Sequence, residues 1–153
     1  MARDAPADAA WRSGRRYLAA QARVVPVGVP AADAPPVTPS AVPHPEAFRA
    51  AMDSALLTRV GLTVGKRNAR RAVDRALVKR VLRESARHAL PVLDAAAVPR
   101  RVDVVLRLKA PLPARESIAR AELKRQVRHE ADSLLAQLAG WLRATATTSG
   151  ASA

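Results

Sequence analysis

Alternating apolar and polar positions predict two β-strands. In residues 59–65 (RVGLTVG) every second position is apolar, and the segment ends at a glycine. Residues 102–108 (VDVVLRL) alternate in the same way, and Pro111 and Pro113 follow shortly afterwards. A period of two places every second side chain on the same side of a strand. Both segments are therefore expected to be strands with one apolar face.

Two longer segments repeat their apolar positions every three or four residues, which predicts helices. The first covers residues 69–90 and is followed by Pro91, which is expected to end it. The second covers residues 114–142. Residues 46–57 also have a helical composition. The two strands and the two long helices make residues 59–142 the core of the predicted domain.

The N-terminal part of the chain is less regular. Residues 6–16 are expected to form a short helix that ends in the sequence SGRR. Residues 22–29 are rich in valine, but Pro26 removes a donor from the hydrogen-bond ladder, so this segment is expected to be an edge strand at most. Residues 26–45 hold seven of the twelve prolines and are expected to form an extended loop.

The domain organisation predicted from these segments is simple. A chain of 153 residues suits one domain, which we place at residues 1–142, with residues 26–45 as a proline-rich insertion. The last stretch, residues 143–153, is small and polar and is expected to be a disordered tail.

Composition narrows the possible functions. The chain has no cysteine, which excludes disulfide scaffolds and thiol catalysis, and its three histidines (His44, His88 and His129) are too scattered to suggest a metal site. No apolar run approaches the roughly 18 residues of a membrane span. The first 25 residues lack the apolar block of a signal peptide. We therefore expect a cytoplasmic protein with no membrane partner.

The charge is strongly positive and unevenly distributed. The chain holds 26 Lys and Arg against 13 Asp and Glu, a net charge of +13. Residues 59–87 alone hold ten basic and two acidic residues, which gives +8, whereas residues 1–58 carry only +1 and residues 88–153 carry +4. Such an excess indicates a polyanionic partner, and its surface is expected within residues 59–87.

A helical wheel separates the basic from the apolar positions of the 69–90 helix. One side is apolar, and the other carries a ridge about 24 Å long, because basic residues recur every four positions. Solvated helix faces usually mix charges of both signs, so a face of one sign favours phosphate binding. A membrane-surface helix would need Trp or Phe on its apolar side, and this one has neither. The ridge consists of Arg71, Arg75, Lys79, Arg83 and Arg87, with Arg80 on the same side.

The turn before this helix adds further candidates. Its sequence, Gly65-Lys66-Arg67-Asn68, is basic and precedes a helix N-terminus, where backbone N–H groups favour phosphate. Trp11 and Tyr17 are candidates for stacking on a base of a single-stranded nucleic acid, although packing in the core or a hairpin is the commoner role of such residues. No catalytic set of side chains and no metal ligands stand out. The candidate phosphate-binding residues are Lys66, Arg67, Arg70, Arg71, Arg75, Lys79, Arg80 and Arg83.

Two blocks of sequence resemble the protein subunit of bacterial ribonuclease P. Residues 59–67 (RVGLTVGKR) follow the family pattern Arg-x-Gly-Leu-x-Val-x-Lys-Lys/Arg, and residues 72–84 (AVDRALVKRVLRE) follow Ala-Val-x-Arg-Asn-Arg-x-Lys-Arg-x-x-Arg-Glu. Residues 103–108 are similar to the last strand of the family, and residues 13–16 to the link after its first helix. The matching positions are Arg59, Gly61, Leu62, Val64, Lys66, Arg67, Ala72, Val73, Arg75, Lys79, Arg80, Arg83 and Glu84. The chain departs from the pattern at Ala76 and Leu77, where the family has Asn and Arg.

The resemblance implies a fold and a function. The implied fold is a two-layer α+β sandwich in the order helix, three strands, helix, strand, helix, with a left-handed βαβ crossover that is an exception to the usual hand. The implied function is to bind the catalytic RNA through the basic helix and the preceding loop. A cleft between that helix and the sheet would take the single-stranded 5′ leader of precursor tRNA, with Trp11 and Tyr17 as the candidates for contact with a leader base. The RNA, with bound Mg²⁺, would remove the leader, and the protein, a monomer outside the ribonucleoprotein, would bind no cofactor itself.

Two other functions remain open at this stage. The first is a diverged basic protein that binds structured RNA without a role in tRNA processing, which the loss of Asn and Arg at Ala76 and Leu77 favours somewhat. The second is a DNA-binding regulator, whose recognition helix would need base-reading residues such as Asn or Gln. The 69–90 helix offers mainly Arg and Lys, which makes the regulator the weakest of the three readings.

Overall fold

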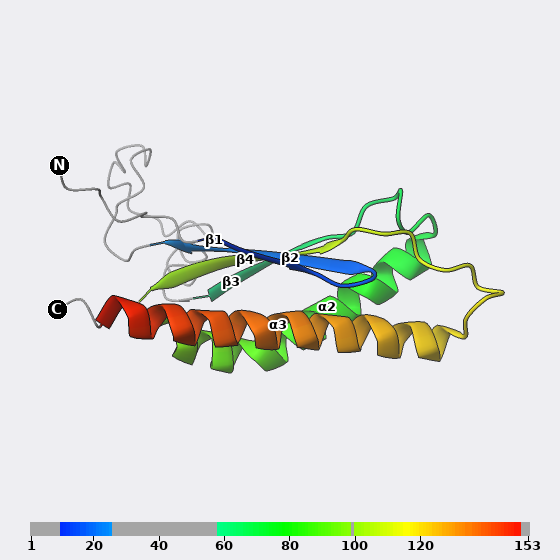
Figure 1. Ribbon diagram of the computed structural model, residues 1–153. Coiled ribbons are helices and arrows are strands. Elements are labelled where there is room, and N and C mark those ends of the chain that lie inside the picture. Colours follow the sequence, from blue (N-terminus) through cyan, green and yellow to red (C-terminus); the bar gives the residue numbers. More distant parts are fainter. Residues whose placement is uncertain (1–9, 26–57, 99, 151–153) are drawn as a thin grey trace, which may run out of the picture.

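The computed structural model describes residues 10–25, 58–98 and 100–150. These residues form a four-stranded sheet and two long helices packed on one of its faces (Figure 1). The elements along the chain are strands β1 (Ala10–Gly14), β2 (Leu18–Val25) and β3 (Thr58–Thr63), helix α2 (Ala72–Ala97), strand β4 (Arg101–Leu108) and helix α3 (Arg120–Gly150). The predicted two-layer α+β sandwich is therefore confirmed.

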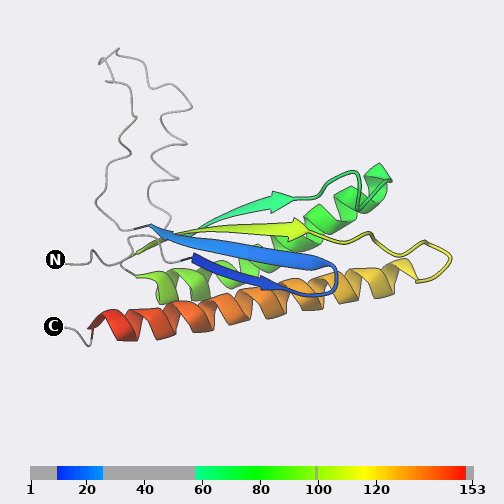
Figure 2. The same ribbon diagram turned by 45° about the horizontal axis from the view of Figure 1, so that its top comes forward.

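The strands lie in the order β1-β2-β4-β3. β1 pairs with β2 and β2 with β4 in antiparallel fashion, whereas β3 and β4 are parallel. Figure 2 looks onto the uncovered face of the sheet, and α2 passes behind β3 and β4 on its way from one strand to the other. With the helix on that side, the β3-α2-β4 connection is left-handed, the rare hand for such a crossover.

The core lies between the sheet and the two helices. Alternate residues of β2 and β4 point towards the helices and are buried, and their neighbours point to the other side. Helices α2 and α3 pack stripes of aliphatic side chains against this face of the sheet. Each buried Leu stabilises the fold by about 1.5–3 kcal/mol relative to an exposed one. The largest fully buried side chains include Leu18, Leu106 and Leu108 of the sheet, Val81, Leu82 and Leu93 of α2, and Leu134, Leu138 and Leu142 of α3.

The N-terminal predictions need two corrections. The helix expected over residues 6–16 is wrong where the structure describes it, because residues 10–14 form β1. The strand expected at 22–29, at an edge, instead begins at Leu18 and lies between β1 and β4. β2 ends at Val25, and Pro26 lies outside the described residues. The predicted loop at 26–45 and helix at 46–57 lie outside the described residues.

Both long helices extend further than predicted. α2 continues through Pro91 to Ala97, because the exposed Pro91 loses only one backbone bond while Leu93 and the alanines beyond it are buried. α3 begins at Arg120 rather than 114 and runs to Gly150, which corrects the prediction of a disordered tail over residues 143–150. In that stretch the hydroxyls of Thr147 and Thr148 donate to the carbonyls four residues earlier, at 3.1 Å each, as helical threonines do.

Candidate nucleic-acid interface

The segment between β3 and α2, residues 65–71, is here called the basic loop. Its central residue, Asn68, is bonded to the end of β4 and to the segment that follows it. The side-chain amide of Asn68 donates to the carbonyl of Leu108 at 2.9 Å, and the carbonyl of Asn68 accepts from the amide of Leu112, also at 2.9 Å. Ala69 donates from its amide to the carbonyl of Gly65 at 3.2 Å and is itself buried. The loop therefore has a defined shape against the end of β4.

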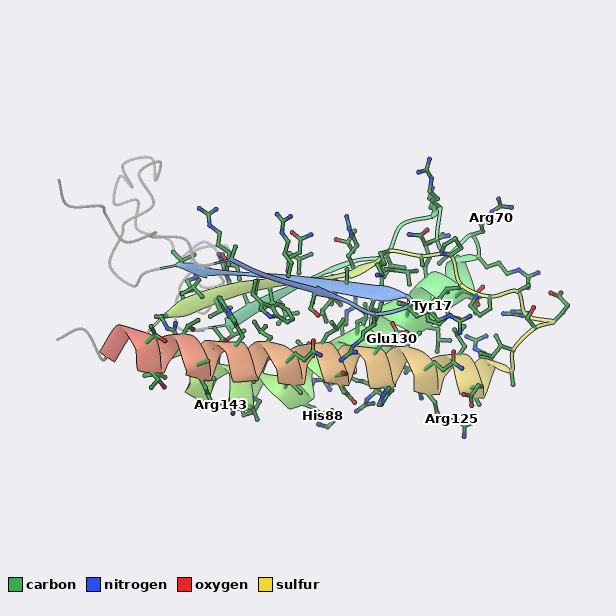
Figure 3. The ribbon with its side chains drawn as sticks, in the orientation of Figure 1. Tyr17, Arg70, His88, Arg125, Glu130 and Arg143 are labelled. Atoms are coloured by element: carbon green, nitrogen blue, oxygen red, sulfur yellow. The ribbon has the colours of Figure 1, made fainter. Side chains whose placement is uncertain are left out.

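Four cations of the basic loop point to the solvent. The side chains of Lys66, Arg67, Arg70 and Arg71 are exposed, and Figure 3 shows Arg70 directed away from the body of the protein. Within residues 10–25, 58–98 and 100–150, none of the four forms an ion pair with a carboxylate. A fixed backbone with unpaired guanidinium groups is suited to phosphate, which Arg binds through two parallel bonds.

Arg75 makes a contact within the protein that the sequence does not predict. Its Nη1 donates to the carbonyl oxygens of Ala69 and Arg70, at 3.0 and 2.8 Å, and the residue is half-buried. The guanidinium thus braces the basic loop from the first turn of α2. The sequence places Arg75 in the basic ridge but gives no sign of this contact, which depends on the loop folding back over the helix.

The rest of the ridge divides between solvent and a groove. Arg80 is exposed and Lys79 is half-buried. Arg83 and Arg87 line a groove of about 520 Å³ between α2 and β3, together with Arg59 of that strand. The predicted ridge therefore does not present one uniform surface: its start braces the loop and its later part faces the edge strand.

The two acidic residues of the basic segment are both paired with arginines from other elements. Glu84 accepts a hydrogen bond from Arg128 of α3 at 3.2 Å. Asp74 lies 3.8 Å from Arg115, which precedes α3. These contacts turn the carboxylates away from the ridge, so its cations keep a single sign of charge.

A second basic surface lies on the open sheet face, the side of the sheet that α2 and α3 leave uncovered. Alternation and register place five arginines there: Arg12, Arg23, Arg59, Arg101 and Arg107. Asp103 shares this face and accepts from Arg59 Nε and Nη2 at 2.8 and 3.0 Å. The hydrogen bonds from Arg59 hold the pKa of Asp103 below its ordinary value, against a smaller opposing effect of burial. Arg23, Arg59 and Arg107 fall within segments whose sequence predicts strands, so alternation could have placed them on one face, whereas Arg12 lies where a helix was expected.

The two aromatic candidates lie on the helix side of the sheet. Tyr17 is only 5% exposed and belongs to the core, which contradicts its predicted role in stacking on a base and supports the packing alternative. Trp11 is half-buried and packs against the same core. Ala76, where the family pattern has Asn, is exposed, whereas Leu77, where it has Arg, packs against the core.

The described parts of the chain contain no group of three or more His, Cys, Asp or Glu that could hold a metal ion. Of the helices described, none is long and apolar enough to cross a membrane.

The architecture is that of a two-layer α+β protein with a concentration of cations at the start of its crossover helix. A family model described as Ribonuclease P matches residues 38–117, just over half of the 153-residue chain. The chain belongs to the ribonuclease P family. The match spans β3, the basic loop, α2 and β4, and these elements share one sheet and core with β1, β2 and α3. Comparisons with curated proteins and with solved structures give no significant match.

Proposed function

We propose that this protein is the subunit of ribonuclease P that binds the catalytic RNA through the basic loop and the exposed cations of α2. The observation that supports the proposal is the braced loop. The side chain of Asn68 ties it to β4 and Arg75 binds two of its carbonyls, while its cations remain exposed and without carboxylate partners among the described residues. A preformed set of cations loses little conformational entropy when phosphates bind.

We further propose that the groove between α2 and β3 binds the single-stranded 5′ leader of precursor tRNA. Arg83 and Arg87 line its helix wall, so an extended phosphate backbone lying along the edge of β3 would meet cations from α2. The apolar lining from Val60 and Leu62 gives the sugars and bases a less polar surface. Few aromatic residues are available, which favours contacts to phosphate and sugar over base stacking and therefore little dependence on leader sequence.

In this proposal the protein carries no catalytic residue. The RNA chain holds the Mg²⁺ ions and performs the hydrolysis, and the protein, a monomer before it joins the RNA, places positive charge between two polyanions. That charge lowers the repulsion between catalytic RNA and precursor tRNA, so less Mg²⁺ is needed for their association.

Reconstitution tests this function. Purified protein is added to the catalytic RNA of ribonuclease P at a low Mg²⁺ concentration, and removal of the 5′ leader from precursor tRNA is measured. The proposal predicts clear stimulation over RNA alone. A chain that binds the catalytic RNA but gives no stimulation would instead support the alternative, a diverged RNA-binding protein without a role in tRNA processing, which the exposed Ala76 in place of Asn favours.

A further inference from the structure

The hairpin turn between β1 and β2, residues 14–17, lies at the same end of the molecule as the basic loop. The two are joined through the end of β4. The carbonyl of Tyr17 accepts from the amide of Lys109 at 2.9 Å, and the preceding residue, Leu108, accepts from Asn68 of the basic loop. Figure 3 shows Tyr17 and Arg70 at this end of the protein, with Glu130 of α3 beside Tyr17. The turn and the loop are thus neighbours fixed to the same strand.

The turn is held by hydrogen bonds within the hairpin and by further hydrogen bonds to α3. Its own closing bond runs from the amide of Arg15 to the carbonyl of Leu18 at 2.7 Å. In addition, Oε2 of Glu130 accepts from the amides of Tyr17 and Leu18 at 2.9 and 3.0 Å. Ser133, one turn further along α3, accepts from Arg15 Nη2 at 2.7 Å. A half-buried carboxylate on two backbone amides makes strong, charge-assisted bonds and fixes the turn on α3.

The cations of this rigid turn point outward. Arg16 is exposed, and its guanidinium lies over the ring of Tyr17, 5.1 Å from the centroid, which orients it. Lys109 is also exposed and extends across Gly14: a Cβ at that position would lie 3.0 Å from its Nζ. Neither cation has a carboxylate partner among the described residues.

We propose that this hairpin turn, together with Lys109, is a second RNA-contacting element, and that Glu130 is the residue that positions it beside the basic loop. The inference rests on the proposed function, because its partner is the phosphate backbone of the same folded RNA that the basic loop binds. Glu130 acts through the turn and touches no RNA. An acidic residue thereby strengthens the binding of a polyanion, the opposite of what its charge alone would do.

The test compares binding of the catalytic RNA by variants across a range of salt concentrations. R16A/K109A should lower the slope of log affinity against log salt by about 1.5, since each lost phosphate contact removes roughly 0.7–0.9. R143E is the matched control: it changes the net charge by the same two units, at the other end of the molecule (Figure 3), and should leave the slope unchanged. Equal slopes for R16A/K109A and R143E would overturn the proposal.

Glu130 is tested separately. Glu130→Ala makes the protein more positive by one charge, so a purely electrostatic effect would strengthen RNA binding, whereas loss of positioning should weaken it several-fold. Glu130→Gln keeps an oxygen that can accept both amide bonds and should restore affinity. Tighter binding by E130A would contradict the role of Glu130. If E130A does not fold, the R16A/K109A slope still decides whether the turn contacts RNA, because E130Q should at least equal wild type under either reading.

The outcomes also separate this inference from the proposed function. If the wild-type protein itself binds the catalytic RNA without salt dependence, the proposed function fails. If wild type binds with a steep slope that substitutions in the basic loop reduce, while R16A/K109A behaves like R143E, only the second element is refuted.

Discussion

The two ends of this molecule use arginine in different ways. At one end, Arg100 donates to the carbonyl of Leu142 at 2.8 Å and to the hydroxyl of Thr145 at 3.0 Å, and so links the connection after α2 to the last turns of α3. At the other end, the four cations of the basic loop are exposed and paired with no carboxylate in the described structure. The same residue type closes the fold in one place and is left available for a partner in the other.

This difference shows that net charge overstates the surface available for binding. Arg75 and Arg128 both add to the positive charge, but Arg75 braces the basic loop and Arg128 pairs with Glu84. The end of the molecule that carries the basic loop differs in that its cations have a fixed backbone and no carboxylate partner among the described residues.

The largest effect is expected from removing the unpaired cations. The variant K66Q/R67Q/R70Q/R71Q should bind the catalytic RNA roughly a hundredfold more weakly at 0.15 M salt, because four phosphate contacts account for about three units of salt slope. Its thermal stability should be unchanged, since these side chains are exposed. Equilibrium binding and circular dichroism melting check the two halves of this prediction, and a large loss of stability would contradict it.

The converse is expected at the other end. Arg100→Ala should lower the free energy of unfolding by about 1–3 kcal/mol, because the carbonyl of Leu142 and its neighbours lose a charged donor. RNA affinity should stay within about twofold of wild type. Urea denaturation measures the first quantity, with the exposed Arg143→Ala as control, which should change stability by less than about 0.5 kcal/mol. Weakened RNA binding by folded R100A would contradict the claim that Arg100 serves only the fold.

How far the sequence leads can be seen at particular residues. Alternation in residues 102–108 and the helical period of α3 correctly predicted which faces are buried. Such a pattern depends only on which side of a single strand or helix packs on the core. Residues 10–14 form a strand because they pair with β2, and that partner is chosen by tertiary structure. Pro91 lies within α2 because Leu93 is buried beyond it, a gain that local propensity does not contain.

The candidate site shows the same limit. Exposed cations such as Arg70 could be predicted from residue spacing and from the family pattern, because both depend only on the order of residues in the sequence. The bracing role of Arg75 and the anchoring of the hairpin turn by Glu130 join residues that are distant in sequence or in a folded-back loop. Periodic patterns in the sequence do not predict such hydrogen bonds, so these contacts could be identified only from the three-dimensional structure.

The smallest effect concerns the open sheet face. Hydrogen bonds from Arg59 lower the pKa of Asp103, so the stabilising contribution of this carboxylate is present above its unfolded pKa of about 3.9 and is lost as the pH falls through the lower, folded value. Because the pair is more than a third exposed, Asp103→Asn should cost only about 0.2–1 kcal/mol at pH 7. Denaturation at pH 7 and near pH 2 measures the difference from wild type, which should shrink towards zero in acid. An equal difference at both pH values would exclude the charge of Asp103 as its source.

The most direct test of the central claim is the salt dependence of binding to the catalytic RNA. Wild type, K66Q/R67Q/R70Q/R71Q and R100A are compared between 50 and 500 mM salt by equilibrium titration. The account predicts that the loop variant loses about three units of log–log slope, while R100A keeps the slope of wild type. The same slope for wild type and the loop variant would show that the basic loop does not contact RNA phosphates.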